Sequence, residues 1–185
     1  MQPTCRVGVT VSFLRMDGRP DDPGRPLPPG TSLFGIKACT VPFYRYLYDT
    51  VGGQYVWWLR RSLPDAAIQA ILHDPSVSLT VLYRGGEPAG FFELDRRHGT
   101  LVNLSYFGLM PAATGMGLGG PFLSAAVDAA FALGAQSVTV NTCTADHPRA
   151  LPGYLRAGFK VVRSVREVWD VPTRLGLAIP ERLRI

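Results

Sequence analysis

A glycine-rich segment between an apolar run and a helical pattern is the first feature of this sequence that could do chemistry. Residues 109–120 read LMPAATGMGLGG. Glycine allows unusual backbone angles and close approach of a ligand, and the start of a helix presents free N–H groups at the positive end of its dipole. Phosphate oxygens bind well in such a place. The segment therefore predicts an anion site, most simply one for a pyrophosphate.

The same segment can be interpreted in two other ways. Gly115, Gly117 and Gly120 satisfy the GxGxxG pattern of a dinucleotide-binding βαβ unit. That unit needs an acidic residue at the end of its next strand, whereas the strand expected here ends in NTCT at residues 141–144. We consider the match accidental. A tight turn without a ligand is the simpler alternative, which the flanking strand and helix make less probable.

Cys143 and His147 lie four residues apart, a spacing that also fits a nucleophile with its base or a pair of metal ligands. A strand-to-helix loop between them explains the spacing more simply, because Asp146 or His147 can cap the helix that follows. The three cysteines are widely separated and form no CxxC pair, which argues against a disulfide framework and against structural zinc. We expect reduced thiols and no metal.

These residues need a framework, and the hydrophobic pattern predicts one. Alternating apolar residues predict strands near residues 6–16, 32–40, 77–83, 89–94, 101–110, 137–142 and 159–171. Helical spacing predicts helices from residue 42 to the glycine pair at 52–53, and over 64–72, 122–133 and 147–157. Hairpins come early in the chain and crossover helices late. The predicted fold is α/β, with a mixed, largely antiparallel central sheet and helices on both faces.

Length and composition limit the classes of protein that remain. The 185 residues fit one domain over 1–185, with a proline- and glycine-rich loop at 17–30 and a C-terminal extension at 172–185. No apolar stretch is long enough to cross a bilayer and no secretory signal is apparent, so we expect a cytoplasmic protein without membrane association. The net charge of +5 is spread along the chain, which gives no support for nucleic acid binding.

Two motifs together resemble the GNAT N-acetyltransferase superfamily. Its Q/R-x-x-G-x-G/A loop is similar to residues 114–119, and its N-x-x-A-x-x-x-Y-x-x-x-G-F element is similar to residues 147–159. The second element aligns with His147, Ala150, Tyr154, Gly158 and Phe159. The specific resemblance covers residues 87 to about 159, and the expected order of elements extends it to most of the chain.

The resemblance implies acetyl-CoA as co-substrate and an amine as acceptor. The pyrophosphate would lie on the N–H groups of residues 115–120, and the pantetheine arm would run along Leu109 and Met110, where the strands at 101–110 and 137–142 separate. The implied cofactor-binding residues are Leu109, Met110, Thr114, Gly115, Met116, Gly117, Leu118, Gly119, Gly120, His147 and Tyr154. Thr114 stands where the family usually has arginine or glutamine, and His147 where it usually has asparagine.

The resemblance also implies residues for catalysis. Tyr154 matches the tyrosine that often protonates the departing thiolate in the family. Related enzymes often place a glutamate base on the strand before the loop, but residues 101–110 contain no carboxylate. Glu93, on the neighbouring strand, is the preferred base, acting directly or through water. An exposed structural carboxylate would explain Glu93 equally well.

Six aromatic residues lie in the region that shapes the acceptor site in the resembling family, and they form either an acceptor pocket or part of the core. They are Tyr44, Tyr46, Tyr48, Tyr55, Trp57 and Trp58. The expected function is acetyl transfer from acetyl-CoA to a primary amine of a small molecule or peptide, by direct attack in a ternary complex. A non-catalytic acyl-CoA-binding or sensing module remains the alternative. A homodimer is possible, and the acceptor cannot be identified from the sequence.

Overall fold

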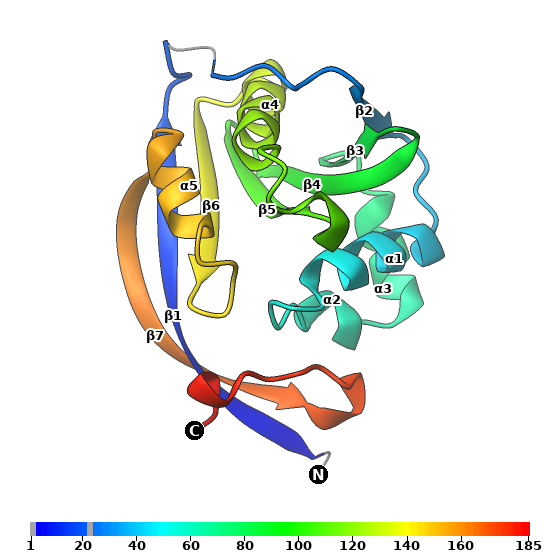
Figure 1. The fold of residues 1–185 in the computed structure, drawn as a ribbon, viewed down its shortest axis with the longest axis vertical. Helices are drawn as coiled ribbons and strands as arrows, with labels where there is room; N and C mark the ends of the chain where they lie inside the picture. The colour runs from blue at the N-terminus through cyan, green and yellow to red at the C-terminus, as the bar shows by residue number, and fades with distance from the viewer. Residues whose placement is uncertain (1–2, 22–23) are drawn as a thin grey trace.

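A computed structural model describes residues 3–21 and 24–185, and its centre is a seven-stranded sheet in the order β2-β3-β4-β5-β6-β1-β7 (Figure 1). The strands are β1 (Thr4–Asp17), β2 (Thr31–Ile36), β3 (Val77–Arg84), β4 (Glu87–His98), β5 (Leu101–Leu109), β6 (Ser137–Cys143) and β7 (Lys160–Pro172). All neighbouring strands are antiparallel except β5 and β6. The mixed, largely antiparallel sheet predicted from the sequence is confirmed.

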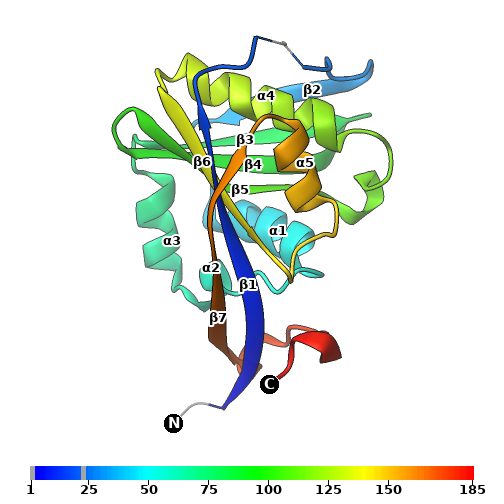
Figure 2. The same ribbon diagram turned by 90° about the vertical axis from the view of Figure 1, so that its left-hand side faces the viewer.

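The helices lie on both faces of this sheet (Figure 2). They are α1 (Val41–Gly52), α2 (Leu59–Ser62), α3 (Asp65–Leu72), α4 (Gly119–Ala132) and α5 (Ala150–Arg156). Successive residues of a strand point to opposite faces, and the β4 neighbours Phe91 and Phe92 show this clearly. Phe91 packs against Tyr44 of α1, whereas Phe92 packs against Phe122 of α4. The short helix α2 was not predicted.

Strand β1 takes a place that its position in the chain did not predict. The early strands suggested antiparallel hairpins, but β1 does not pair with β2. It lies between β6 and β7, with Val11 opposite Cys143 on one side and Val165 on the other. The alternating valines of β1 have a buried face, as expected, while the irregular segment after β1 carries the chain across to the opposite edge of the sheet.

Strands β5 and β6 pair only at their beginnings. Their parallel ladder covers Leu101–Leu104 and Ser137–Val140, and the remainder of each strand has no partner in the other. A register shift between β4 and β5 precedes the separation, next to Glu93 and Leu94. A bulge of this kind bends a strand locally. The sheet is therefore split at its centre, as the resemblance to the GNAT superfamily implied.

The interior consists of two groups of buried side chains. The larger fills the space between the sheet and the helices, and the smaller lies under the outer halves of β1 and β7. Ile179 and Leu183 of the C-terminal segment belong to the smaller group, and the Ile185 N–H donates to the carbonyl of Arg6. This segment packs on the body of its own chain, a question that the sequence left open. No helix among the described residues is long and apolar enough to cross a bilayer.

Candidate active site

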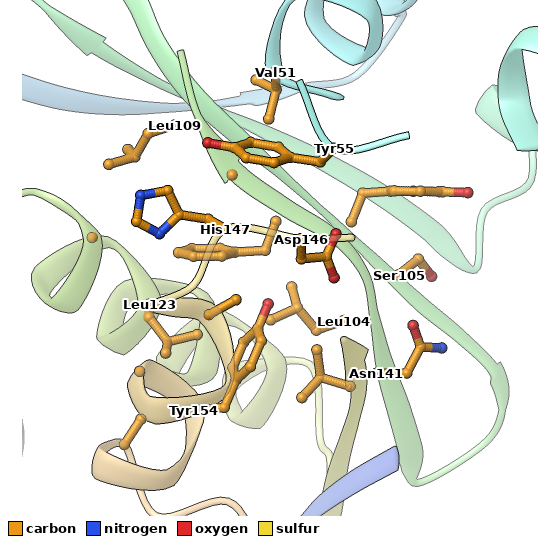
Figure 3. Close-up of a pocket in the computed structure, with 18 of the residues that line it drawn as sticks. Val51, Tyr55, Leu104, Ser105, Leu109, Leu123, Asn141, Asp146, His147 and Tyr154 are labelled. Carbon is orange, nitrogen blue, oxygen red and sulfur yellow. The ribbon is translucent and has the colours of Figure 1, made fainter. Parts of the chain in front are cut away.

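The split between β5 and β6 opens into a large cleft with a volume of about 1770 Å³ (Figure 3). Its walls come from β5, from the end of β6, from the loop before α4, from α5 and from the segment between α1 and α2. Beyond the paired residues, β5 and β6 no longer bond to each other. The backbone N–H and C=O groups that would have formed those bonds therefore face the cleft. A long ligand can therefore lie between the strands and bind their backbone.

The glycine-rich loop forms one end of the cleft. Gly115 and Gly117 have φ angles of +85° and +75°, values that residues with a side chain rarely adopt. α4 begins at Gly119, and the residue that caps it, Leu118, has no side chain that accepts a hydrogen bond. Within the described part of the chain, the N–H groups of residues 115–120 donate to no backbone carbonyl. A row of free donors at a helix N-terminus is suited to an anion.

The predicted cofactor residues divide into those that line the cleft and those that hold the loop in place. The lining residues are Leu109, Thr114, Gly115, Gly117, Gly119, Gly120, His147 and Tyr154. Met110 and Leu118 are instead buried in the core, and the Met116 side chain is half exposed outside the cleft. Met110 and Leu118 can therefore contact a ligand only through their main chain. Thr114 donates its hydroxyl to the Met110 carbonyl at 3.2 Å, which stabilises the turn.

Tyr154 projects from α5 into the cleft (Figure 3). Its ring packs edge-on against Phe107 and Phe159, so its position is well determined. No hydrogen bond of its hydroxyl is found among the described residues. Burial, together with the negative charge of Asp146, raises the pKa of Tyr154 well above its ordinary value near 10. The phenol therefore keeps its proton at neutral pH and has it available for transfer.

Asp146 brings a carboxylate to the same part of the cleft. One oxygen accepts from the Thr142 hydroxyl at 2.7 Å and from the Cys143 N–H at 2.9 Å, and the other accepts from the Trp57 indole at 3.2 Å. These bonds give it a fixed orientation. The sequence suggested Asp146 only as a possible helix cap. The residue before α5 is Arg149, and no side chain caps that helix.

Glu93 does not lie where the sequence hypothesis required it. It is only 1% exposed and does not line the cleft. Its two oxygens accept from the Arg60 guanidinium and the Tyr44 hydroxyl, each at 2.7 Å. Buried charges are stable only when paired in this way. The hypothesis missed the ion pair because Arg60 is distant in sequence. Glu93 is paired with a cation and lies away from the cleft, so it is not placed to act as the direct base.

The ion pair supports the aromatic wall of the cleft. The Arg60 guanidinium lies 5.3 Å from the ring centre of Tyr106. The Tyr106 ring contacts the Tyr48 ring edge-on and the Trp57 ring at a tilt. Tyr106 and Trp57 line the cleft. Glu93 thus acts on the site at a distance, by holding Arg60 against Tyr106.

The six aromatic residues noted in the sequence have different environments. Tyr44 and Tyr48 are buried, and burial raises the pKa of both hydroxyls well above the ordinary value. Tyr46 is half exposed on the outside. Tyr55, Trp57 and Trp58 line the cleft, and Tyr48 reaches its edge. The segment after α1 therefore faces the cleft, whereas most of α1 belongs to the core.

Cys143 and His147 both line the cleft but do not form a catalytic pair. Burial and the charge of Asp146 raise the pKa of the Cys143 thiol to about 12, so it carries no thiolate at neutral pH. The His147 ring contacts Tyr55 edge-on, and its Nδ1 accepts from the Arg149 N–H at 3.1 Å. The arrangement is that of a structured loop.

Comparisons with known proteins agree with this geometry. The acetyltransferase (GNAT) family model matches residues 44–159. A GCN5-related N-acetyltransferase from Sphaerobacter thermophilus is 18% identical over 92% of this chain and 53% of its own, with a TM-score of 0.63. An aminoglycoside acetyltransferase from an uncultured soil metagenomic sample is 15% identical over 69% of this chain and 87% of its own, with a TM-score of 0.56.

A tandem GNAT protein from the clavulanic acid biosynthesis pathway is 13% identical over 91% of this chain and 55% of its own, with a TM-score of 0.58. The chain spans about half to two-thirds of the length of several such structures, from 53% to 63%. No curated protein sequence matches it. The structural likenesses show the fold, and the family model covers more than half of the residues. The chain belongs to the GNAT acetyltransferase family.

Proposed function

We propose that this protein transfers an acetyl group from acetyl-CoA to a primary amine of a small-molecule or peptide acceptor, with both substrates bound together. The observation that carries the proposal is that the free N–H groups of residues 115–120, the open edges of β5 and β6, and the Tyr154 phenol all face one cleft. Each suits a different part of the donor: its pyrophosphate, its pantetheine arm and its sulfur.

The donor fits the residues present. Gly115, Gly117, Gly119 and Gly120 would hold the pyrophosphate through the main chain, because this loop lacks the long side-chain donor common in the family. The pantetheine amides would bond to the unpaired backbone near Leu109. The thioester supplies the activated acetyl group. Its carbonyl would then lie in the split of the sheet.

In the proposed reaction the amine nitrogen attacks the thioester carbonyl, the new C–N bond forms and the C–S bond breaks. Tyr154 donates its proton to the sulfur as the C–S bond breaks, and the phenolate then regains a proton from solvent. Because the pKa of the phenol lies above that of the thiol, near ~8.5, the phenol is reprotonated readily after each turnover. We assign the amine proton to Asp146 in place of Glu93, because Asp146 lines the cleft beside Tyr154. Its negative charge also favours the approach of an ammonium group.

The aromatic side chains of Tyr55, Trp57, Trp58 and Tyr106 would contact the acceptor. Trp57 is fixed by its bond to Asp146, and Tyr106 by Arg60. Aromatic faces beside a carboxylate are suited to an amine that is protonated before it reacts. The aminoglycoside acetyltransferase among the matched structures gives one class of polyamine to test first.

An assay of free CoA thiol tests the function, with acetyl-CoA and a panel of polyamines, aminoglycosides, amino acids and peptides. Thiol release that depends on one acceptor supports the proposal. Asp146→Asn keeps an amide oxygen that can accept from Thr142 and Cys143, but its NH2 group can neither accept from Trp57 nor take up a proton, so kcat should fall by about 100-fold. An unchanged kcat in this variant would remove Asp146 from the mechanism.

A non-catalytic acyl-CoA-binding module is the second candidate. The observation that favours it is that β5 carries no carboxylate and that Glu93 is enclosed by Arg60 and Tyr44. Such a protein would bind CoA and acetyl-CoA without consuming either. Tight binding combined with no thiol release for any acceptor of the panel would favour this candidate over the enzyme.

A further inference from the structure

Strand β7 forms an edge of the sheet with an apolar surface that has no partner in its own chain. It is the last strand in the order, and Figure 1 shows no helix or strand beyond it. Four of its valines are exposed: Val161 by 44%, Val162 by 65%, Val165 by 36% and Val168 by 47%. Long apolar edges attract further strands, and proteins usually shield them.

The hydrogen-bonding groups of β7 that face outward can be identified from β1. The backbone of Thr10 exchanges hydrogen bonds with Thr144, so its groups point away from β7. In an antiparallel ladder this direction alternates, so the groups of Val11 point toward β7, where Val165 lies opposite. The N–H and C=O of Val165 therefore face inward. Those of Ser164 and Arg166 face the open side.

The sequence of β7 is complementary to itself when two copies run antiparallel about Val165. In that register Arg163 lies opposite Glu167 of the second copy. β7 has a bulge beyond Arg163, where Phe13 pairs with Arg163 but Leu14 pairs with Val161, so the regular pairing is limited to residues 163–167. The outward-facing Ser164 and Arg166 oppose each other and form the hydrogen-bonded pair, while Val165 lies opposite itself in the closer, non-hydrogen-bonded pair. Charge, side-chain character and backbone direction agree in this one register.

Neighbouring registers lose this agreement. Centring the pair on Ser164 places Arg163 opposite Val165, and centring it on Arg166 places that arginine opposite itself. Opposite charges across a strand pair stabilise it and like charges destabilise it. The charged side chains are also on the correct face. Arg163 lies over the Phe13 ring at 4.3 Å, and Glu167 accepts from the Trp169 indole at 2.8 Å.

We propose that this protein forms a symmetric dimer in which the β7 strands of two copies pair antiparallel, with Val165 on the two-fold axis. The two seven-stranded sheets then become one continuous sheet. Most walls of the cleft come from β5, β6, α5 and the segments before α2 and α4, and the β7 residue that lines it, Trp169, lies outside the paired residues 163–167. The dimer does not depend on the proposed function.

Cysteine cross-linking tests the register directly. Val165→Cys places two thiols opposite each other at a Cα distance of about 4.5 Å, which permits a disulfide. Val162→Cys is the matched control, because Val162 is more exposed but its copies would lie six residues apart along the strand, about 20 Å. Under mild oxidation the first variant should form a covalent dimer, whereas Val162→Cys and the wild type, with its three native cysteines, should not.

Charge reversal tests whether Arg163 of one copy faces Glu167 of the other. Arg163→Glu and Glu167→Arg should each raise the dimer dissociation constant in sedimentation by about tenfold, and the double exchange should restore it, because both pairs reform with reversed polarity. Thermal unfolding of each variant confirms that it is folded. A wild-type chain that stays monomeric at high concentration, equal cross-linking of both cysteine variants, or no recovery in the double exchange would overturn the proposal.

Discussion

The two walls of the cleft are built in different ways. The wall at residues 115–120 uses the main chain: positive φ angles, a helix start and free N–H groups, with almost no side chain involved. The opposite wall uses side chains, because Tyr106 is held by the buried Arg60–Glu93 ion pair and Trp57 by a hydrogen bond to Asp146. The first wall should therefore be sensitive to backbone changes and the second to the loss of single polar groups.

The largest expected effect is on the side-chain wall. Glu93→Ala leaves the Arg60 guanidinium without its partner in a nearly closed environment, and the free energy of unfolding should fall by about 3 to 5 kcal/mol. Urea unfolding measures this loss of stability. Tyr44→Phe, which removes one hydrogen bond to the same carboxylate, serves as the control and should cost about 1 kcal/mol. Equal losses in both variants would mean that the ion pair is not the main contribution.

Alkaline pH should destabilise the same wall. Burial raises the pKa of Tyr44, Tyr48 and Tyr154, so between about pH 10 and the higher folded pKa values the unfolded chain loses protons that the folded chain keeps. Their stabilisation is complete below pH ~10 and is lost as pH rises, by about 1.4 kcal/mol per group and pH unit. Urea midpoints at pH 9, 10 and 11 check this, and a flat profile would contradict it.

A catalytic effect of intermediate size should follow from Tyr154→Phe. The change removes the hydroxyl but keeps the ring contacts with Phe107 and Phe159. We expect kcat to fall about 100-fold, the scale of a lost general acid, with the dissociation constant of acetyl-CoA nearly unchanged. Steady-state kinetics together with calorimetric titration separate the two. A normal kcat would exclude Tyr154 as the acid.

The main-chain wall should respond to a change of one methyl group. Gly117→Ala adds a Cβ at a φ of +75°, so the loop is strained or moves, and acetyl-CoA affinity should fall about tenfold. Met116→Ala is the matched control, since that side chain lies half exposed outside the cleft. Calorimetric titration of both variants makes the comparison. A similar loss of acetyl-CoA affinity in both variants would show that the positive φ of Gly117 is not needed for binding.

The smallest effect is expected at Cys143. Its raised pKa of about 12 makes the thiol a poor nucleophile, so Cys143→Ser should keep kcat within about twofold. The serine also preserves the size of the side chain. A loss comparable with that of Tyr154→Phe would instead support an acetyl-cysteine intermediate and contradict direct transfer.

The difference between the walls also explains what the sequence could predict. Residues 109–120 and 147–159 are short and local, so the loop and the helix starts were found from local pattern, and Tyr154 from the resemblance of its element to the GNAT superfamily. The split between β5 and β6 was also implied by that resemblance and is present. Glu93 was placed on the correct strand, but nothing local to it shows that Arg60 and Tyr44, far away in sequence, occupy both its oxygens.

The position of β1 was missed for the same physical reason. Alternating valines reveal a strand with a buried face, but they do not show which strands it pairs with. Those partners, β6 and β7, are more than a hundred residues away. The short helix α2 was also missed, because four residues are too few to show helical periodicity. It nevertheless carries Arg60, on which the aromatic wall depends.

The most direct test of the main-chain site is thermal unfolding in the presence of acetyl-CoA, CoA and NAD at increasing concentration. A ligand that binds only the folded protein raises its Tm with concentration. The structure predicts a rise with acetyl-CoA and with CoA, none with NAD, and a much weaker rise for Gly117→Ala. If neither CoA compound raises the Tm at millimolar concentration, the loop at residues 115–120 is not a CoA site and the proposed function fails with it.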